Sequence, residues 1–134
     1  MISKNNRIIE CLKTITGIGF LTAFTLYSEL IDIKRFMRLD HLASYIGLIP
    51  SINSSDEHEI NRGLTSRQNK RLRSQLIESA WVAVRHDPAL TQSYNKYLQR
   101  MSKQKAIVRI AKKLLNRIRY VWLNEKEYVT GVVC

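Results

Sequence analysis

The chain has 134 residues, of which 22 are Lys or Arg and 11 are Asp or Glu, so its formal net charge at pH 7 is +11. This length suits a single domain, and 45% hydrophobic residues are enough for a core, which excludes a disordered basic tail. No apolar run is long enough to cross a bilayer and no signal peptide is recognisable, so the charge indicates a polyanionic partner, nucleic acid before an anionic membrane surface.

Helical periodicity dominates the first half of the chain. Apolar residues at helical spacing predict helices over 7–15 and 20–31, separated by a break that contains glycine. A shorter helix is expected to begin near Asp40, which would serve as its N-cap, and the polar stretch 51–62 is interpreted as a loop. The inner face of the second helix is expected to carry Leu21, Phe24, Leu26, Leu30 and Ile31.

The second half of the chain is predicted to hold the longest helices. The segment Thr65-Ser66-Arg67-Gln68 has the form of a capping box, which would open a helix from about Ser66 to His86. Asp87-Pro88 ends this helix because the residue before a proline disfavours helical geometry. Further helices are expected over 90–98 and 103–123. On the first of these long helices the inward-facing positions are expected to be Leu72, Leu76, Ala80 and Ala83, joined by Ile77, Trp81 and Val84. On the last helix they are expected to be Ile107, Ile110, Leu114, Ile118 and Val121.

Positive charge is concentrated in these later helices. The segment 88–124 contains nine cations and no acidic residue, and a second basic run covers 62–73. Valine and aromatic runs at strand spacing are scarce. We therefore predict an all-α fold: one compact helical domain over 1–134, with basic helices in 66–124. A basic face opposite an apolar face is also typical of a helix on a membrane surface, which is the weaker interpretation.

The motif Ile15-Thr16-Gly17-Ile18-Gly19 lies between the first two predicted helices. Glycine adopts positive φ without steric cost, so the chain can reverse tightly there, and N–H groups at the start of the next helix would form a phosphate site. This pattern indicates a helix-hairpin-helix element over 7–31, which would hold a nucleic-acid backbone without reading its sequence. The alternative is an ordinary tight turn between packed helices.

Cations near the start of the helix predicted at Ser66 favour the same kind of partner. Positive side chains are unfavourable in a first turn because the helix dipole is positive there, and a bound phosphate would reverse that effect. The alternative is a solvated charged face. The candidate nucleic-acid-binding residues are Gly17, Ile18, Gly19, Arg62, Arg67, Lys70, Arg71, Arg73, Lys105, Arg109, Lys112, Lys113 and Arg119.

Signals for catalysis are weak in the residues themselves. The three histidines show no metal-type spacing with one another or with the two cysteines, so no metal site is predicted. Neither a phosphate-binding glycine loop nor a Ser-His-Asp arrangement is recognisable. Ser54 and Ser55 are, by spacing alone, ordinary residues of a polar loop. The two distant cysteines favour a reducing, cytoplasmic environment.

A series of motifs runs through the chain from Ile8 to Tyr128: Leu12-x-x-Ile15-x-Gly17-Ile18-Gly19-x-x-Thr22-Ala23, Glu29-Leu30-Ile31-Asp32-Ile33, Arg35-Phe36, Leu42-Ala43-Ser44-Tyr45-Ile46-Gly47-Leu48-Ile49-Pro50, Ser54-Ser55, Gly63-Leu64-Thr65-x-x-x-Asn69-x-x-Leu72-Arg73, Ala80-Trp81, Asp87-Pro88 and Lys112-Lys113-Leu114-Leu115. In this order and spacing, the set resembles the C-terminal transposase domain of the IS116/IS110/IS902 insertion-sequence transposases, which are related to Piv-type DNA invertases. Asp56 and Gln68 depart from the family pattern, which usually has glycine at both positions.

The resemblance implies a partner domain and a nucleophile. Such transposases pair this helical domain with an N-terminal RuvC-like domain, whose acidic tetrad would hold a divalent metal, expected to be Mg²⁺, outside these 134 residues. They recombine DNA through a serine of the helical domain, which matches Ser55 here, with the adjacent Ser54 as alternative. Attack on phosphorus would give a covalent phosphoserine. Alone, the chain is expected to hold no cofactor and to catalyse nothing.

The resemblance also implies partners and a location. DNA, contacted through its phosphate backbone, is the expected ligand, and an RNA encoded by the element is an open second one. The full-length protein is expected to form a homo-oligomer, with no membrane contact, in the bacterial cytoplasm at the nucleoid. The competing hypothesis is a standalone helix-hairpin-helix module that binds nucleic acid without catalysis.

Overall fold

The computed structural model describes the backbone of residues 4–49 and 63–129, and the side chains of 6–49 and 70–129. Within these ranges the chain forms six α-helices, one short 3-10 helix and no strand, so the predicted all-α fold is confirmed. The elements in chain order are α1 (Lys4–Lys13), α2 (Phe20–Leu30), η1 (Ile33–Arg35), α3 (Leu39–Ile46), α5 (Gly63–His86), α6 (Pro88–Leu98) and α7 (Lys103–Asn124).

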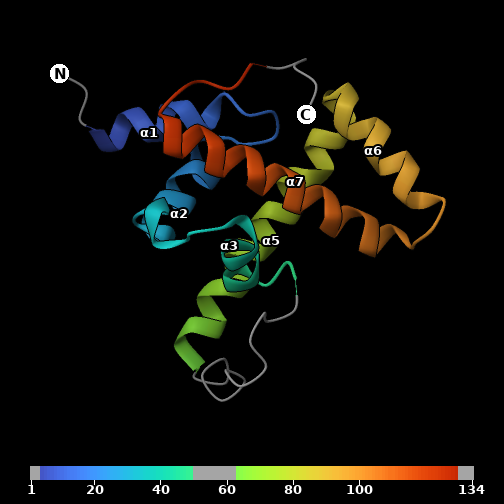
Figure 1. Cartoon of the computed structure of the whole chain (residues 1–134), viewed down its shortest axis with the longest axis horizontal. Helices are drawn as coiled ribbons and strands as arrows, with labels where there is room; N and C mark the ends of the chain where they lie inside the picture. Colours follow the sequence, from blue (N-terminus) through green and yellow to red (C-terminus); the bar gives the residue numbers. More distant parts are fainter. Residues whose placement is uncertain (1–3, 50–62, 130–134) are drawn as a thin grey trace.

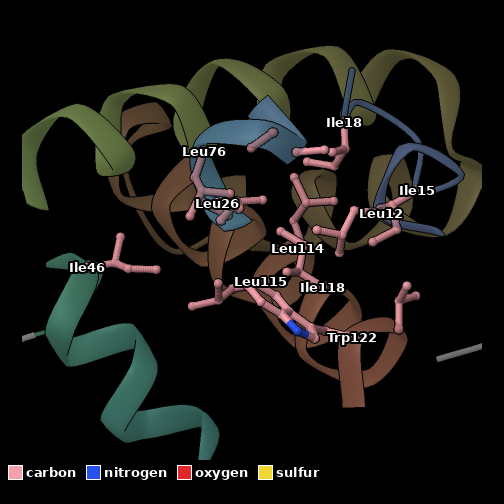
Figure 2. Packing of buried hydrophobic residues seen from close by; sticks show 14 of the residues in the cluster. Leu12, Ile15, Ile18, Leu26, Ile46, Leu76, Leu114, Leu115, Ile118 and Trp122 are labelled. Atoms are coloured by element: carbon pink, nitrogen blue, oxygen red, sulfur yellow. The ribbon is translucent and has the colours of Figure 1, made fainter. Parts of the chain in front are cut away.

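The two long helices α5 and α7 cross near the middle of the molecule (Figure 1). α7 also packs against α1, α3 and α6, and α3 lies beside the crossing (Figure 1). Most positions predicted to face inward on α5 and α7 are buried, but Ile77 is half-buried and Trp81 is exposed. Trp81 lies at the edge of the inner face, where its ring contacts that of Tyr94 on α6. Burying each leucine or isoleucine stabilises the fold by roughly 1.5–3 kcal/mol. Figure 2 shows the resulting core, in which Leu114, Leu115, Ile118 and Trp122 pack among Leu12, Ile15, Ile18, Leu26 and Leu76.

The start of α5 differs from the prediction. The helix begins at Gly63, so Thr65 lies inside it and the capping-box prediction is wrong. The Ser/Thr-x-x-Gln pattern forms a capping box only when its Ser or Thr itself has non-helical geometry, and the same pattern also fits the interior of a helix. The dipole argument fails with it, because Arg67 and Lys70 lie beyond the first turn, where the effect of the dipole has decayed.

Two helices of the first half also differ from the prediction. In α2, Leu26 and Leu30 are buried as expected, whereas Leu21, Phe24 and the following Ile31 are exposed. Apolar side chains occur on all sides of α2, so their periodicity does not indicate which face packs against the core.

In α3, Arg38 rather than Asp40 occupies the N-cap. Asp40 lies in the first turn, where the positive end of the helix dipole still stabilises its carboxylate. The helix ends at Ile46 because Gly47, the next residue, has a φ of 96°. Glycine adopts this left-handed conformation without strain, and it commonly terminates a helix.

A buried ion pair fixes α6 against α7. Asp87 ends α5 and caps α6: its carboxylate accepts hydrogen bonds from the N–H groups of Ala89 (3.0 Å) and Leu90 (3.4 Å), and Pro88 occupies the first helical position. α6 therefore begins two residues before the predicted Leu90. The other carboxylate oxygen lies 2.5 Å from Nη1 of Arg117 on α7, and both side chains are almost fully buried. One of the nine cations of 88–124 is thus a core residue.

Candidate nucleic-acid interface

The glycine turn between α1 and α2 is anchored to the core. Gly17 has a φ of 94°, and a Cβ atom there would lie 2.6 Å from the backbone oxygen of Ser79 on α5. Ile18 is buried, and its N–H donates to the carbonyl oxygen of Ile15 at 3.0 Å. These contacts explain the glycine and the apolar residue by packing, as expected of a tight turn. The helix-hairpin-helix interpretation stays a prediction.

The exposed side of this turn carries little free positive charge. Gly19 is extended, with a φ of −93°, and precedes α2, whose exposed first residues are Phe20 and Leu21. The ammonium of Lys13 lies 5.8 Å from the Phe20 ring centroid and 2.9 Å from a carboxylate oxygen of Glu10. The hairpin surface is therefore mainly apolar.

Four predicted cations meet at another place, where α3, α5 and α7 come together. They border an open groove of about 730 Å³ beside the end of α3. The cations come from α5 and α7, which are distant in sequence and adjacent in the fold. We call this feature the basic groove; its lining residues are Leu48, Ile49, Arg73, Met101, Gln104, Lys105, Val108, Arg109 and Lys112.

Two of the groove cations are partly engaged by the protein. Nε of Arg73 donates to the carbonyl oxygen of Gly47 at 3.1 Å, which uses one of the five N–H donors of the guanidinium. Nζ of Lys112 lies 3.1 Å from Oδ1 of Asp40, and both side chains are partly exposed. Exposed pairs of this kind contribute only about 0–1 kcal/mol, so an incoming phosphate can compete for Lys112.

The other two groove cations are exposed on the first turns of α7. Lys105 lies three residues after the N-cap residue Ser102, whose hydroxyl oxygen accepts a hydrogen bond from the backbone N–H of Lys105 at 3.3 Å. The guanidinium of Arg109 lies 5.9 Å from the ring centroid of Tyr97 on α6. A cation at this distance is attracted by the ring, which orients the arginine without neutralising it.

The remaining candidate residues lie apart from the basic groove. Arg71 approaches Glu29 at 3.8 Å, and Arg119 donates to the backbone oxygens of Phe36 (3.3 Å) and Met37 (2.9 Å), a structural contact between α7 and the segment before α3. Lys70 and Lys113 are exposed on α5 and α7. Ser54, Ser55 and Arg62 lie outside the described residues, as does the side chain of Arg67.

Sequence reasoning overlooked the apolar part of the groove. Leu48 is buried, and Ile49, Met101 and Val108 are half-buried along its lining. One signal was available: Val108 follows Lys105 by three residues and precedes Lys112 by four, a spacing that places it on the basic face of α7.

A further polar cavity lies between α1 and the segment after α7. It is lined by carboxylates and cations together, beside the buried Cys11. Desolvation raises the pKa of the Cys11 thiol above its ordinary value, so the thiol stays protonated and unreactive at neutral pH. In the part of the chain that the structure describes, no three His, Cys, Asp or Glu side chains converge on a metal site, and no helix is long and apolar enough to cross a membrane.

The sequence of the chain matches the model of the transposase IS116/IS110/IS902 family over residues 9–96, which is more than half of its length. The chain belongs to this family of transposases. The matched region runs from α1 into α6 and includes Arg73 of the basic groove, while the groove residues of α7 follow it.

Two curated relatives that are named as transposases support the assignment. The chain is 31% identical over 116 residues to the transposase for insertion sequence element IS1111A of Coxiella burnetii. The aligned region covers 87% of this chain and 32% of that protein. It is also 31% identical over 130 residues to the putative transposase y4qE of Sinorhizobium fredii, covering 95% of this chain and 32% of the relative. The chain thus spans about a third of the length of these curated relatives. No solved structure matches it.

Proposed function

We propose that this chain is the DNA-binding, serine-bearing part of an insertion-sequence transposase, and that it holds the DNA backbone in the basic groove. The observation that carries the proposal is the convergence of Arg73, Lys105, Arg109 and Lys112 from two helices on one open surface. Phosphate contacts by Lys and Arg supply most of the sequence-independent affinity of DNA-binding proteins, because each contact releases condensed counterions.

Chain connectivity supports a role for Ser55 next to this groove. Ile49 lines the groove, and Ser55 follows it by six residues. Six residues span at most roughly 20 Å even when fully extended, so in this proposal Ser55 attacks a phosphate within that distance of Ile49. In the proposed step, Oγ of Ser55 bonds to phosphorus and loses its proton, one P–O ester bond of the backbone breaks, and the leaving oxygen takes up a proton.

Further parts of the proposal concern the full-length transposase. A RuvC-like domain would hold the divalent metal, expected to be Mg²⁺, that lowers the free energy needed to form a serine alkoxide. This chain would then contribute DNA binding and the nucleophile and would be inactive alone. An oligomer of the full-length protein and an element-encoded RNA belong to the same proposal.

Duplex binding by a paired variant tests the groove. We expect Lys105→Gln/Arg109→Gln to weaken binding of a mixed-sequence duplex by roughly ten-fold or more at fixed low salt, measured by fluorescence anisotropy. The control Lys34→Gln/Lys96→Gln removes the same charge at exposed positions outside the groove and should change affinity less than about three-fold. Equal losses in both variants would show that only net charge matters and would contradict the groove.

The same measurement separates the groove from the hairpin. A standalone helix-hairpin-helix module would place the phosphate contacts at Gly17, Ile18 and Gly19, although the Ile18 N–H is already used within the turn. In that case the groove variant would bind duplex normally, and Lys13→Gln, next to the hairpin, would reduce affinity instead.

The serine is tested by strand exchange in a full-length transposase that contains this chain. Ser55→Ala should abolish formation of the covalent protein–DNA adduct while duplex binding is retained, and Ser54→Ala is the matched neighbour. Undiminished strand exchange by Ser55→Ala would exclude it as nucleophile, and loss in Ser54→Ala alone would transfer the role to Ser54.

A further inference from the structure

The basic groove has an apolar lining that phosphate binding does not explain. Leu48 is 5% exposed and belongs to the core, so the apolar surface open to a ligand is that of the half-buried Ile49, Met101 and Val108, which lie between the cations. A surface that contacts only phosphates gains nothing from apolar side chains, because the DNA backbone is charged and hydrated. The lining therefore points to a ligand with both negative charges and apolar faces.

The size of the groove narrows the choice of ligand. Its volume of about 730 Å³ lies within the range of small-molecule sites, roughly 300–1,000 Å³, so a group the size of a nucleotide can enter it. In a duplex the base faces are stacked inside, and such a ligand would leave Met101 and Val108 facing water. An unpaired nucleotide offers its base to the apolar residues and its phosphates to the surrounding cations.

Resting on the proposed function, we propose that the basic groove binds an unpaired segment of DNA, with a base against Val108 and Met101. Arg73, Lys105 and Lys112 would then contact the flanking phosphates. Arg109 contributes a planar guanidinium, which lies beside Tyr97 and is exposed, and such planes also stack on unpaired bases. DNA rather than RNA is the expected ligand because the family consists of transposases.

The test compares two strands of equal charge. One is a labelled oligothymidylate of about eight nucleotides, and the other is an abasic strand of the same length, which keeps the phosphates and lacks the bases. At fixed low salt we expect the wild-type chain to bind the oligothymidylate roughly ten-fold more tightly than the abasic strand. Equal affinity for the two strands would overturn the inference.

Variants of the lining locate the effect in the groove. Met101→Ser and Val108→Ser should reduce the preference for bases to about two-fold or less without changing the affinity for the abasic strand. Val82→Ser, at an exposed valine of α5 outside the groove, should leave the preference unchanged. Met101 lies between α6 and α7, so its variant tests the inference even if Val108→Ser lowers stability. A preference that persists in both lining variants would overturn the groove as the base site.

The outcomes separate this inference from the function on which it rests. If Lys105→Gln/Arg109→Gln weakens duplex binding but bases add no affinity, the groove binds backbone only and this inference alone fails. If the double variant leaves duplex binding intact, the proposed function fails first. An oligouridylate of the same length that binds more than about ten-fold more tightly than the oligothymidylate would overturn the assignment to DNA.

Discussion

At the scale of single residues, Gly17 shows how one missing methyl group sets the geometry of the hairpin. Its φ of 94° is a conformation that residues with a Cβ rarely adopt, and the backbone of α5 leaves no room for that atom. Gly19, two residues later, has an extended conformation and nothing within 4 Å of the position of a Cβ. Backbone geometry and packing therefore require a glycine at position 17, whereas neither requires one at position 19.

This difference predicts that two alanine variants differ in stability. Gly17→Ala should lower the free energy of unfolding by about 1–3 kcal/mol, because it strains the backbone and pushes against the Ser79 carbonyl. Gly19→Ala should lower it by less, about 0.5 kcal/mol, because its Cβ would meet no atom and only the preference of an N-cap for glycine over alanine is lost. Urea unfolding followed by circular dichroism measures both values, and a Gly17→Ala variant as stable as Gly19→Ala would contradict the packing seen here.

At the scale of elements, one carboxylate links three helices. Asp87 ends α5, caps α6 through two backbone N–H groups and pairs with Arg117 of α7. The guanidinium of Arg117 also lies 4.8 Å from the ring centroid of Tyr128, in the segment after α7. A buried charge that loses its partner is strongly unfavourable, so this pair constrains how α6 packs against α7.

Removing one member of the pair should therefore destabilise the fold. We expect Arg117→Leu to lower the free energy of unfolding by about 3–5 kcal/mol, because Asp87 stays buried without a counter-charge. The double variant Asp87→Asn/Arg117→Leu should recover part of this loss, since asparagine still caps α6 without a charge. Additive losses in the double-mutant cycle would show that the two side chains do not interact.

At the scale of the whole molecule, the distribution of the +11 charge determines how binding responds to salt. Four groove cations that each neutralise a phosphate give a slope of log affinity against log salt of roughly −3.6 for duplex DNA. Lys105→Gln/Arg109→Gln should reduce the slope to roughly −1.8, while the control Lys34→Gln/Lys96→Gln keeps it. A slope that is steeper than about −6 would place further phosphates outside the groove.

Much of this arrangement follows from local patterns. The inner faces of α5 and α7 are evident from apolar residues at helical spacing, because a helix aligns every third and fourth residue whatever surrounds it. Helix caps are harder to predict, because the polar residues that cap helices also occur inside them. Thr65 and Asp40, both predicted as N-caps, lie within α5 and α3 for this reason. The catalytic hypothesis depends on family resemblance, because no spacing distinguishes Ser55 from an ordinary loop serine.

The chain itself thus specifies an all-α fold, strong positive charge and the buried faces of its long helices, since helix formation and amphipathicity are local properties. Only the packing of distant helices places Arg73 beside Lys105, Arg109 and Lys112, buries Arg117, and leaves Phe24 exposed. Which helix faces pack together depends on contacts between residues far apart in sequence, and the periodicity of one helix does not indicate which other helix it contacts. The charge therefore indicates a polyanion, and the tertiary structure shows where four of the cations gather.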